Sequence, residues 1–129
     1  MKTANSINKL AALLKTGETQ IKIYFEDCSH LHYILVKNYK IDLGSHDISD
    51  WDVSDVRDMY RMFYDAKSFN QDIGKWNVSN VNNMQCMFYY AESFNQDISN
   101  WKVNQAADTC YMFRHCPIEE GFKPKGVIK

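Results

Sequence analysis

The sequence predicts an α/β fold: a short solenoid of about three 25-residue turns, each with short parallel strands plus short helices, behind an N-terminal helix/strand cap. Three tryptophans, Trp51, Trp76 and Trp101, place one tryptophan every 25 residues. Residues 51–75 and 76–100 are identical at 15 of 25 positions. A fixed period of about 20–50 residues is typical of repeat architectures, in which each unit buries its apolar face against its neighbours.

Length and composition are those of one folded domain. The chain has 129 residues, of which 45% are hydrophobic and 24% charged, and these are ordinary globular values. We divide it into an N-terminal cap (1–43), the repeats (44–118) and a C-terminal tail (119–129). The net charge of −1 gives no electrostatic basis for binding nucleic acid.

The N-terminal segment predicts a helix followed by a strand. Ser6 is an N-cap residue before an apolar stripe of helical spacing, and Gly17 is a stop signal, so we expect a helix over 6–16. Residues 21–25 alternate between apolar and other side chains, as a strand does. Residues 31–36 fit both a strand and a helix started by Asp27 or Ser29, and we favour the strand, paired as a hairpin.

Each repeat predicts its own short elements. We expect an extended rung over 72–78, a second extended piece over 81–84 and a short helix over 82–91. The helix rests on Met84, Met87 and Phe88, which are spaced i, i+3 and i+4. The third copy, from Trp101, keeps less of the pattern, as terminal repeats do, and residues 119–129 read as irregular.

Two classes of position are constant between repeats. The apolar class predicts columns buried along the repeat axis: Trp51/Trp76/Trp101, Val53/Val78/Val103, Met62/Met87/Met112, Phe63/Phe88/Phe113, Phe69/Phe94 and Ile73/Ile98. The polar class predicts side chains that satisfy the backbone of tight turns: Ser54/Ser79, Asn70/Asn95, Gln71/Gln96 and Asp72/Asp97.

The repeat motif resembles a known family. The pattern W-[DN]-V-S-[DN]-V-x-x-M-x-x-M-F-x-x-A-x-S-F-N-Q-D-I, over residues 44–116, is similar to the BspA-like leucine-rich-repeat proteins, in their 25-residue branch found in bacterial surface lipoproteins. The resemblance implies a leucine-rich-repeat-like solenoid that binds other proteins and carries no catalytic residues. Residues 1–40 show no such resemblance.

The chain shows no pattern for catalysis or a cofactor, and we expect none. Metal binding is the weaker of two interpretations for Cys28, His30 and His32, and for Cys110, His115 and Cys116, because neither set has the paired spacing of a strong site. The other interpretation is surface histidines beside half-buried cysteines. We expect all four cysteines to be free thiols.

The positions that differ between repeats suggest where a partner binds. Tyrosine and arginine dominate interface hot spots, and they gather at positions expected to face outward from the repeat helices. The candidate partner-binding residues are Tyr60, Arg61, Tyr64, Tyr89, Tyr90, Tyr111 and Arg114. Tyr64 and Tyr89, being repeated, also fit a packing column, and the remaining residues also fit a solvated helix face.

The expected function is a non-enzymatic protein–protein interaction module, monomeric or in a heterodimer with its partner. A small intracellular inhibitor or immunity-type protein is one form of it. The alternatives are a surface, adhesin or structural coat component, and a metal-binding protein or enzyme. Because no signal peptide or membrane span is visible, we expect a cytoplasmic protein, or a surface protein if a leader has been removed.

Overall fold

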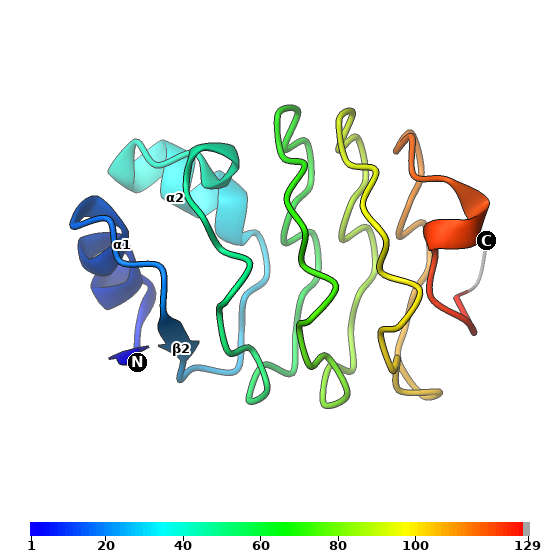
Figure 1. Cartoon of the computed structure of the whole chain (residues 1–129), viewed down its shortest axis with the longest axis horizontal. Helices are drawn as coiled ribbons and strands as arrows, with labels where there is room; N and C mark the ends of the chain where they lie inside the picture. Colours follow the sequence, from blue (N-terminus) through cyan, green and yellow to red (C-terminus); the bar gives the residue numbers. More distant parts are fainter. Residues whose placement is uncertain (128–129) are drawn as a thin grey trace.

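The computed structural model describes residues 1–127. The chain runs from a helical end, where the N-terminus lies, through loops laid side by side, to the C-terminus at the opposite end (Figure 1). We call the segments 51–75, 76–100 and 101–118 repeats 1, 2 and 3. Helices and strands of more than one residue are concentrated before residue 46, apart from one 3₁₀ turn, η2 (Glu120–Phe122), in the tail.

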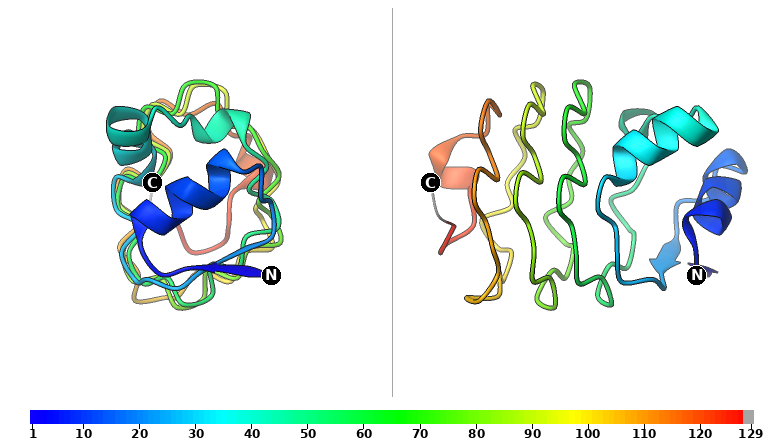
Figure 2. Two further views of the ribbon diagram at one scale, coloured as in Figure 1. Left: turned by 90° about the vertical axis from the view of Figure 1, so that its left-hand side faces the viewer. Right: turned by 180° about the vertical axis from the view of Figure 1, so that it is seen from behind.

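Strand β1 (Lys2–Ala4), helix α1 (Ile7–Lys15) and strand β2 (Ile21–Ile23) form the N-terminal end. The Ser6 hydroxyl accepts a hydrogen bond from the Lys9 N–H, and Gly17 has a φ of 84°, so both predicted ends of the helix are confirmed within one residue. Strands β1 and β2 pair in parallel. Seen end-on, α1 crosses the opening that the loops enclose, and its apolar face is buried there (Figure 2).

Helix α2 (Leu31–Tyr39) occupies the segment for which we favoured a strand, and that prediction is wrong. Both patterns were present, and burial distinguishes them: a strand would place Tyr33 on the same face as Leu31 and Leu35, whereas the helix buries the two leucines and leaves Tyr33 exposed. The residue before it, His30, has a left-handed backbone (φ 56°), so Cys28, His30 and His32 do not share the face of one strand.

The repeats contain consecutive tight turns in place of the predicted helix over 82–91. In repeat 2, the N–H groups of Met87, Tyr89 and Ala91 each donate to the carbonyl three residues back, at 3.0–3.2 Å. Between these turns, Cys86 and Tyr90 adopt left-handed φ values of 58° and 59°, which stop a right-handed helix. Turns closed over three residues produce the same i, i+3 spacing of apolar side chains as a helix, which explains the error.

Alternate residues link one repeat to the next. The N–H groups of Met59, Arg61, Phe63 and Asp65 donate to the carbonyls of Asn83, Gln85, Met87 and Tyr89, and repeat 2 donates to repeat 3 in the same way. The ladder begins before the repeats, because the N–H groups of Cys28, His30 and His32 donate to repeat 1. Residues 28–32 are therefore joined to repeat 1 by main-chain hydrogen bonds.

The predicted fold class, a leucine-rich-repeat-like solenoid of about three turns with short strands and helices in each, is wrong. Among residues 1–127 the α-helices are α1 and α2, and the one sheet has two parallel strands. Within the repeats the extended pairing consists of single bridges, such as Asp58 with Asn83. The class is mixed α/β, with its regular elements at the N-terminal end.

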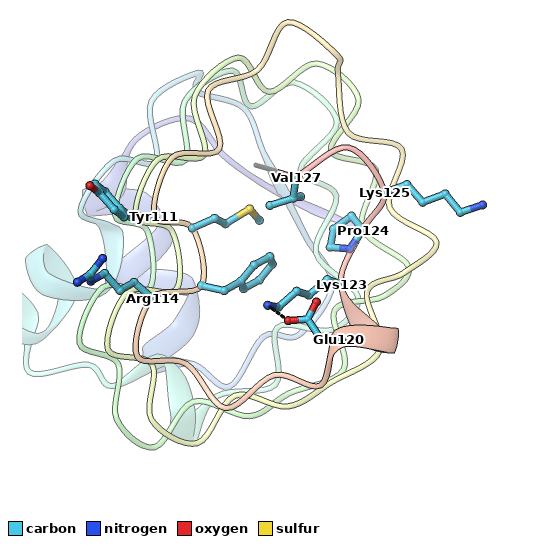
Figure 3. A pocket seen from close by; sticks show the side chains of 9 residues that line it. Tyr111, Arg114, Glu120, Lys123, Pro124, Lys125 and Val127 are labelled. Carbon is cyan, nitrogen blue, oxygen red and sulfur yellow. Dashed lines mark hydrogen bonds and ion pairs between the residues drawn. The ribbon is translucent and has the colours of Figure 1, made fainter. Parts of the chain in front are cut away.

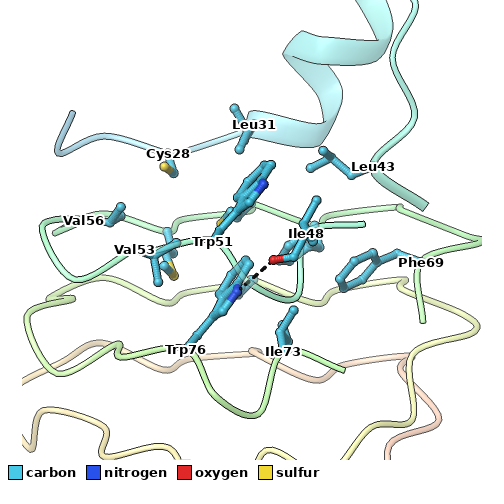
Figure 4. Close-up of a cluster of buried hydrophobic side chains, with 14 of the residues drawn as sticks. Cys28, Leu31, Leu43, Ile48, Trp51, Val53, Val56, Phe69, Ile73 and Trp76 are labelled. Atoms are coloured by element: carbon cyan, nitrogen blue, oxygen red, sulfur yellow. Dashed lines mark hydrogen bonds between the residues drawn. The ribbon is translucent and has the colours of Figure 1, made fainter. Parts of the chain in front are cut away.

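The predicted core residues are buried almost without exception, and Val103 and Phe113 in repeat 3 are the ones left partly exposed. The indole rings of Trp51, Trp76 and Trp101 stack at 6.1 and 6.5 Å within 5° of parallel. The indole N–H of Trp76 donates to the Ile48 carbonyl at 3.1 Å (Figure 4). The constant apolar positions thus form one continuous core.

Most of the constant polar residues bond to turn backbone, as predicted, whereas the hydroxyls of Ser54 and Ser79 donate to the side chains of Asp52 and Asn77. The Gln71 amide donates to the carbonyls of Leu43 and His46. The Asn70 side chain accepts from the Asn95 N–H at 2.9 Å. These bonds replace the strand and helix pairing that the turns lack.

Candidate protein-binding face

The seven candidate residues lie on successive repeats and form one side of the molecule, which we call the aromatic face. Tyr111 is 49% exposed and Arg114 is also exposed. The other five are half-buried. The residues of the aromatic face are Tyr60, Arg61, Tyr64, Tyr89, Tyr90, Tyr111 and Arg114.

Arg61 lies between two tyrosines. Its guanidinium carbon is 5.2 Å from the centre of the Tyr60 ring and 4.7 Å from that of Tyr64. Both distances are within the range of cation–π attraction, which holds the arginine head along the surface. The Arg61 Nε is buried without a hydrogen-bond partner in the described chain, which leaves a donor for an incoming group if the rings move apart.

Ring contacts carry this arrangement into the next repeats. Tyr64 stacks on Tyr89 with centroids 5.3 Å apart, so the interpretation of this pair as a packing column is also met. Tyr89 meets Tyr90 edge-on at 4.8 Å, and Tyr90 stacks on His115 at 4.6 Å. The contacts between rings, together with that of Arg61 on Tyr64, therefore run without a break from Arg61 in repeat 1 to His115 in repeat 3.

Left-handed backbone conformations present several of these side chains. Arg61, Tyr90 and Tyr111 have φ values of 53°, 59° and 55°. Such residues cost about 1–2 kcal/mol relative to right-handed ones, and glycine would avoid that cost. The left-handed positions of the three repeats contain no glycine: they are Arg61, Cys86 and Tyr111, and Asp65, Tyr90 and His115.

Tyr111 and Arg114 form a pair at the end of the face, with the Arg114 guanidinium 5.2 Å from the Tyr111 ring centre. They also border a cavity of about 430 Å³ between repeat 3 and the tail. Figure 3 shows both side chains pointing away from the cavity, whereas Lys123 and Glu120 lie along it. The pair thus belongs to the side of the molecule and not to the cavity interior.

The structure adds residues that the sequence comparison did not select. His30 meets Tyr60 edge-on at 5.3 Å, His115 stacks on Tyr90, and Lys67 lies 6.0 Å from the Tyr90 ring centre. His115 occupies the same repeat position as Tyr90, a signal that the alignment of repeats contained. No sequence signal placed His30 beside repeat 1, because residues 28–32 lack the repeat motif.

The described residues contain no group of three or more His, Cys, Asp or Glu side chains that could hold a metal ion. Burial raises the pKa of the Cys28 thiol and lowers the pKa of His32, so both are held neutral. The four cysteines are free thiols in the structure, as predicted. Over residues 1–127 there is also no helix long and apolar enough to cross a membrane.

Comparison with models of protein families gave a match. A family model described as "Mycoplasma protein of unknown function, DUF285" matches residues 19–121. The match begins at residue 19, well before the repeat motif, so it includes part of the segment in which the sequence showed no resemblance to a known family. A search of curated proteins and a search of solved structures found no similar chain.

Proposed function

The chain belongs to the DUF285 family, and on that premise we propose that it is a non-enzymatic protein-binding module that contacts its partner through the aromatic face. The observation that carries this proposal is the unbroken set of ring contacts between Arg61 and His115. Tyrosine and arginine supply large contact area for modest ordering cost, and they are the residues enriched in interface hot spots.

The contrast between core and face supports the same proposal. Positions such as Phe63 and Phe88 are constant between repeats and fully buried. Apart from the repeated pair Tyr64 and Tyr89, the neighbouring positions of the face change from repeat to repeat, for example Arg61 to Cys86 to Tyr111. Packing fixes the first class, while the second is free to match a partner.

We further propose, on the sequence motif, that the chain is related to the 25-residue-repeat branch of the BspA-like proteins. This relationship concerns the motif W-[DN]-V-S-[DN]-V and its continuation, and it agrees with a binding role. Whether the module serves as an inhibitor of one target or as a surface component depends on the partner.

A comparative pull-down tests the proposal. The wild-type chain and an Arg61→Ala/Tyr90→Ala/Arg114→Ala variant are used as bait in an extract of the native host, and the captured proteins are identified by mass spectrometry. We expect a protein that the wild type captures and the triple variant does not. A matched Asn100→Ala/Lys102→Ala/Gln105→Ala variant, changed at three exposed positions outside the face, should capture it as the wild type does.

The pull-down also has a result that rejects the proposal. If the triple variant captures every protein that the wild type does, at equal yield, the aromatic face is not the interface. Circular dichroism of each bait shows that the variants are folded before the comparison is made.

A further inference from the structure

The chain has three arginines, and two of them lie on the aromatic face. Arg57, outside the face, pairs with the Glu26 carboxylate at 3.3 Å. Arg61 and Arg114 differ from it, because within residues 1–127 neither guanidinium forms an ion pair or a hydrogen bond, and both lie over tyrosine rings. Ring contacts leave these two guanidiniums without the oxygen acceptors that charged N–H groups bond most strongly.

The carboxylates of the same turns bond to other groups. Lys67 pairs with Asp65 at 2.9 Å and with Glu92 at 3.0 Å. Asp58 and Asp108 accept backbone N–H groups at 2.8 and 3.0 Å. The face therefore has two separate unpaired cations among carboxylates, an arrangement that repels a polyanion such as nucleic acid but accommodates two single carboxylates.

Repeat 2 lies between the two arginines and is aromatic and uncharged at the positions of the face. Cys86 occupies the position of Arg61 in repeat 1 and is 6% exposed. Beside it, Tyr89 and Tyr90 meet edge-on at 4.8 Å. A partner that covers the face therefore meets one guanidinium, then tyrosine rings, then the second guanidinium.

Covering the face removes water from both guanidiniums. A charged group that loses water without gaining a hydrogen-bonding partner destabilises the complex, so the partner has to supply acceptors. A carboxylate matches the planar fork of a guanidinium with two parallel hydrogen bonds and also supplies the opposite charge. Asp and Glu are the side chains that provide this group.

We propose that the partner segment which covers the aromatic face carries two carboxylates of Asp or Glu, one for Arg61 and one for Arg114, on either side of apolar or aromatic residues that contact the tyrosines of repeat 2. This inference rests on the proposed function and specifies the chemistry of its partner. The tyrosines supply contact area, while the two charge pairs supply selectivity and fix the register of the segment on the repeats.

Selection from a peptide library tests the inference. The probe is a phage-displayed library of random linear peptides, selected on the immobilised full chain. We expect the bound peptides to contain more Asp and Glu than the unselected library, in pairs separated by apolar or aromatic residues. The tightest peptide is then synthesised twice, once as selected and once with Asn for Asp and Gln for Glu. The amide peptide should bind about tenfold more weakly or worse, because it has lost both charges that face the arginines.

Variants of the chain assign this loss to the two arginines. Arg61→Gln/Arg114→Gln should bind the acidic peptide about tenfold more weakly than the wild type does, and should bind the acidic and amide peptides with similar affinity. Arg57→Gln is the control, because Arg57 lies outside the face and is already paired with Glu26, so it should bind the acidic peptide as the wild type does. Circular dichroism shows that each variant is folded before its affinity is compared.

A Tyr60→Ala/Tyr90→Ala variant separates this inference from the proposed function. If this variant loses the peptide while the arginine variant retains it, the aromatic face is the interface but needs no carboxylates, and the inference alone is overturned. If both variants bind as the wild type does, the inference and the proposed function both fail. The inference is also overturned if the selected peptides are not enriched in Asp and Glu, or if the selection yields no binding peptide.

Discussion

In the tryptophan stack, the contribution of an indole hydrogen bond to stability can be measured separately from that of burying the ring. Trp51 and Trp101 each stack on Trp76, and they are 3% and 4% exposed. The Trp101 indole N–H donates to the Ile73 carbonyl at 2.9 Å, whereas the Trp51 indole N–H is buried without a partner in the described chain. The reason is that no segment before residue 48 reproduces the repeat turn that supplies the carbonyl.

Changing Trp51 or Trp101 to phenylalanine removes a similar apolar area, but only Trp101→Phe also removes a hydrogen bond. Trp101→Phe removes one of the two hydrogen bonds that the Ile73 carbonyl accepts, and the Trp76 N–H still donates to that carbonyl at 3.1 Å. The net loss of one hydrogen bond costs about 0.5–1.5 kcal/mol. Trp51→Phe removes a donor that has no partner, so that cost does not arise. We expect Trp101→Phe to be more destabilising than Trp51→Phe by about 0.5–1.5 kcal/mol, or a few degrees in Tm.

Urea denaturation followed by circular dichroism measures both unfolding free energies, since tryptophan fluorescence differs between the variants. The slope of unfolding free energy against urea should be the same in both, which shows that the midpoints report stability. Equal losses, or a larger loss for Trp51→Phe, would refute the assignment of the bond and of the unpaired donor.

Three further outcomes follow from the packing, the backbone and the turns. Phe88→Ala should lower the free energy of unfolding, measured by urea denaturation, by about 3–5 kcal/mol, because the ring is fully buried. Phe113→Ala should lower it clearly less, because the Phe113 ring is partly exposed. Arg61→Val should be less stable than Arg61→Ala by about 1 kcal/mol in the same assay, because a β-branched residue tolerates the left-handed φ of 53° poorly, and a valine variant as stable as the alanine one would contradict this. The Ser54 hydroxyl and N–H donate to the Asp52 carboxylate and lower its pKa, so its contribution to stability is complete above the unfolded pKa of about 3.9 and is lost as pH falls through the folded pKa. Acid titration of Tm should therefore show a smaller drop for Asp52→Asn, which copies Asn77 of repeat 2, and an identical drop would exclude this role.

The repeat period alone predicted which residues are buried. Trp76 and Phe88 recur at 25-residue spacing, and constant apolar positions in register have few alternatives to a shared core. The period did not predict the backbone between them, because Met84, Met87 and Phe88 have the same spacing on a helix and on consecutive turns. The left-handed residues that decide between the two are not glycines, so the sequence carried no sign of them.

The contacts of the candidate face were predictable only in part. The comparison of repeats selected Arg61 and Tyr90 as positions that differ, which the structure places in one set of ring contacts. It did not place His30 beside Tyr60, because that contact depends on α2 and on the hydrogen bonds of residues 28–32 to repeat 1. Long-range pairing of this kind has no local pattern in the sequence.

The most direct test of the proposed function is the affinity of the identified partner for single variants of the aromatic face. Arg61→Ala and Tyr90→Ala should each weaken binding by about 1–3 kcal/mol in isothermal titration, with little change in Tm. Asn95→Ala is the control, because its side chain bonds to the Glu119 backbone and side chain, so it should lower Tm more than affinity. Partner affinity that is unchanged in both face variants would contradict the proposal.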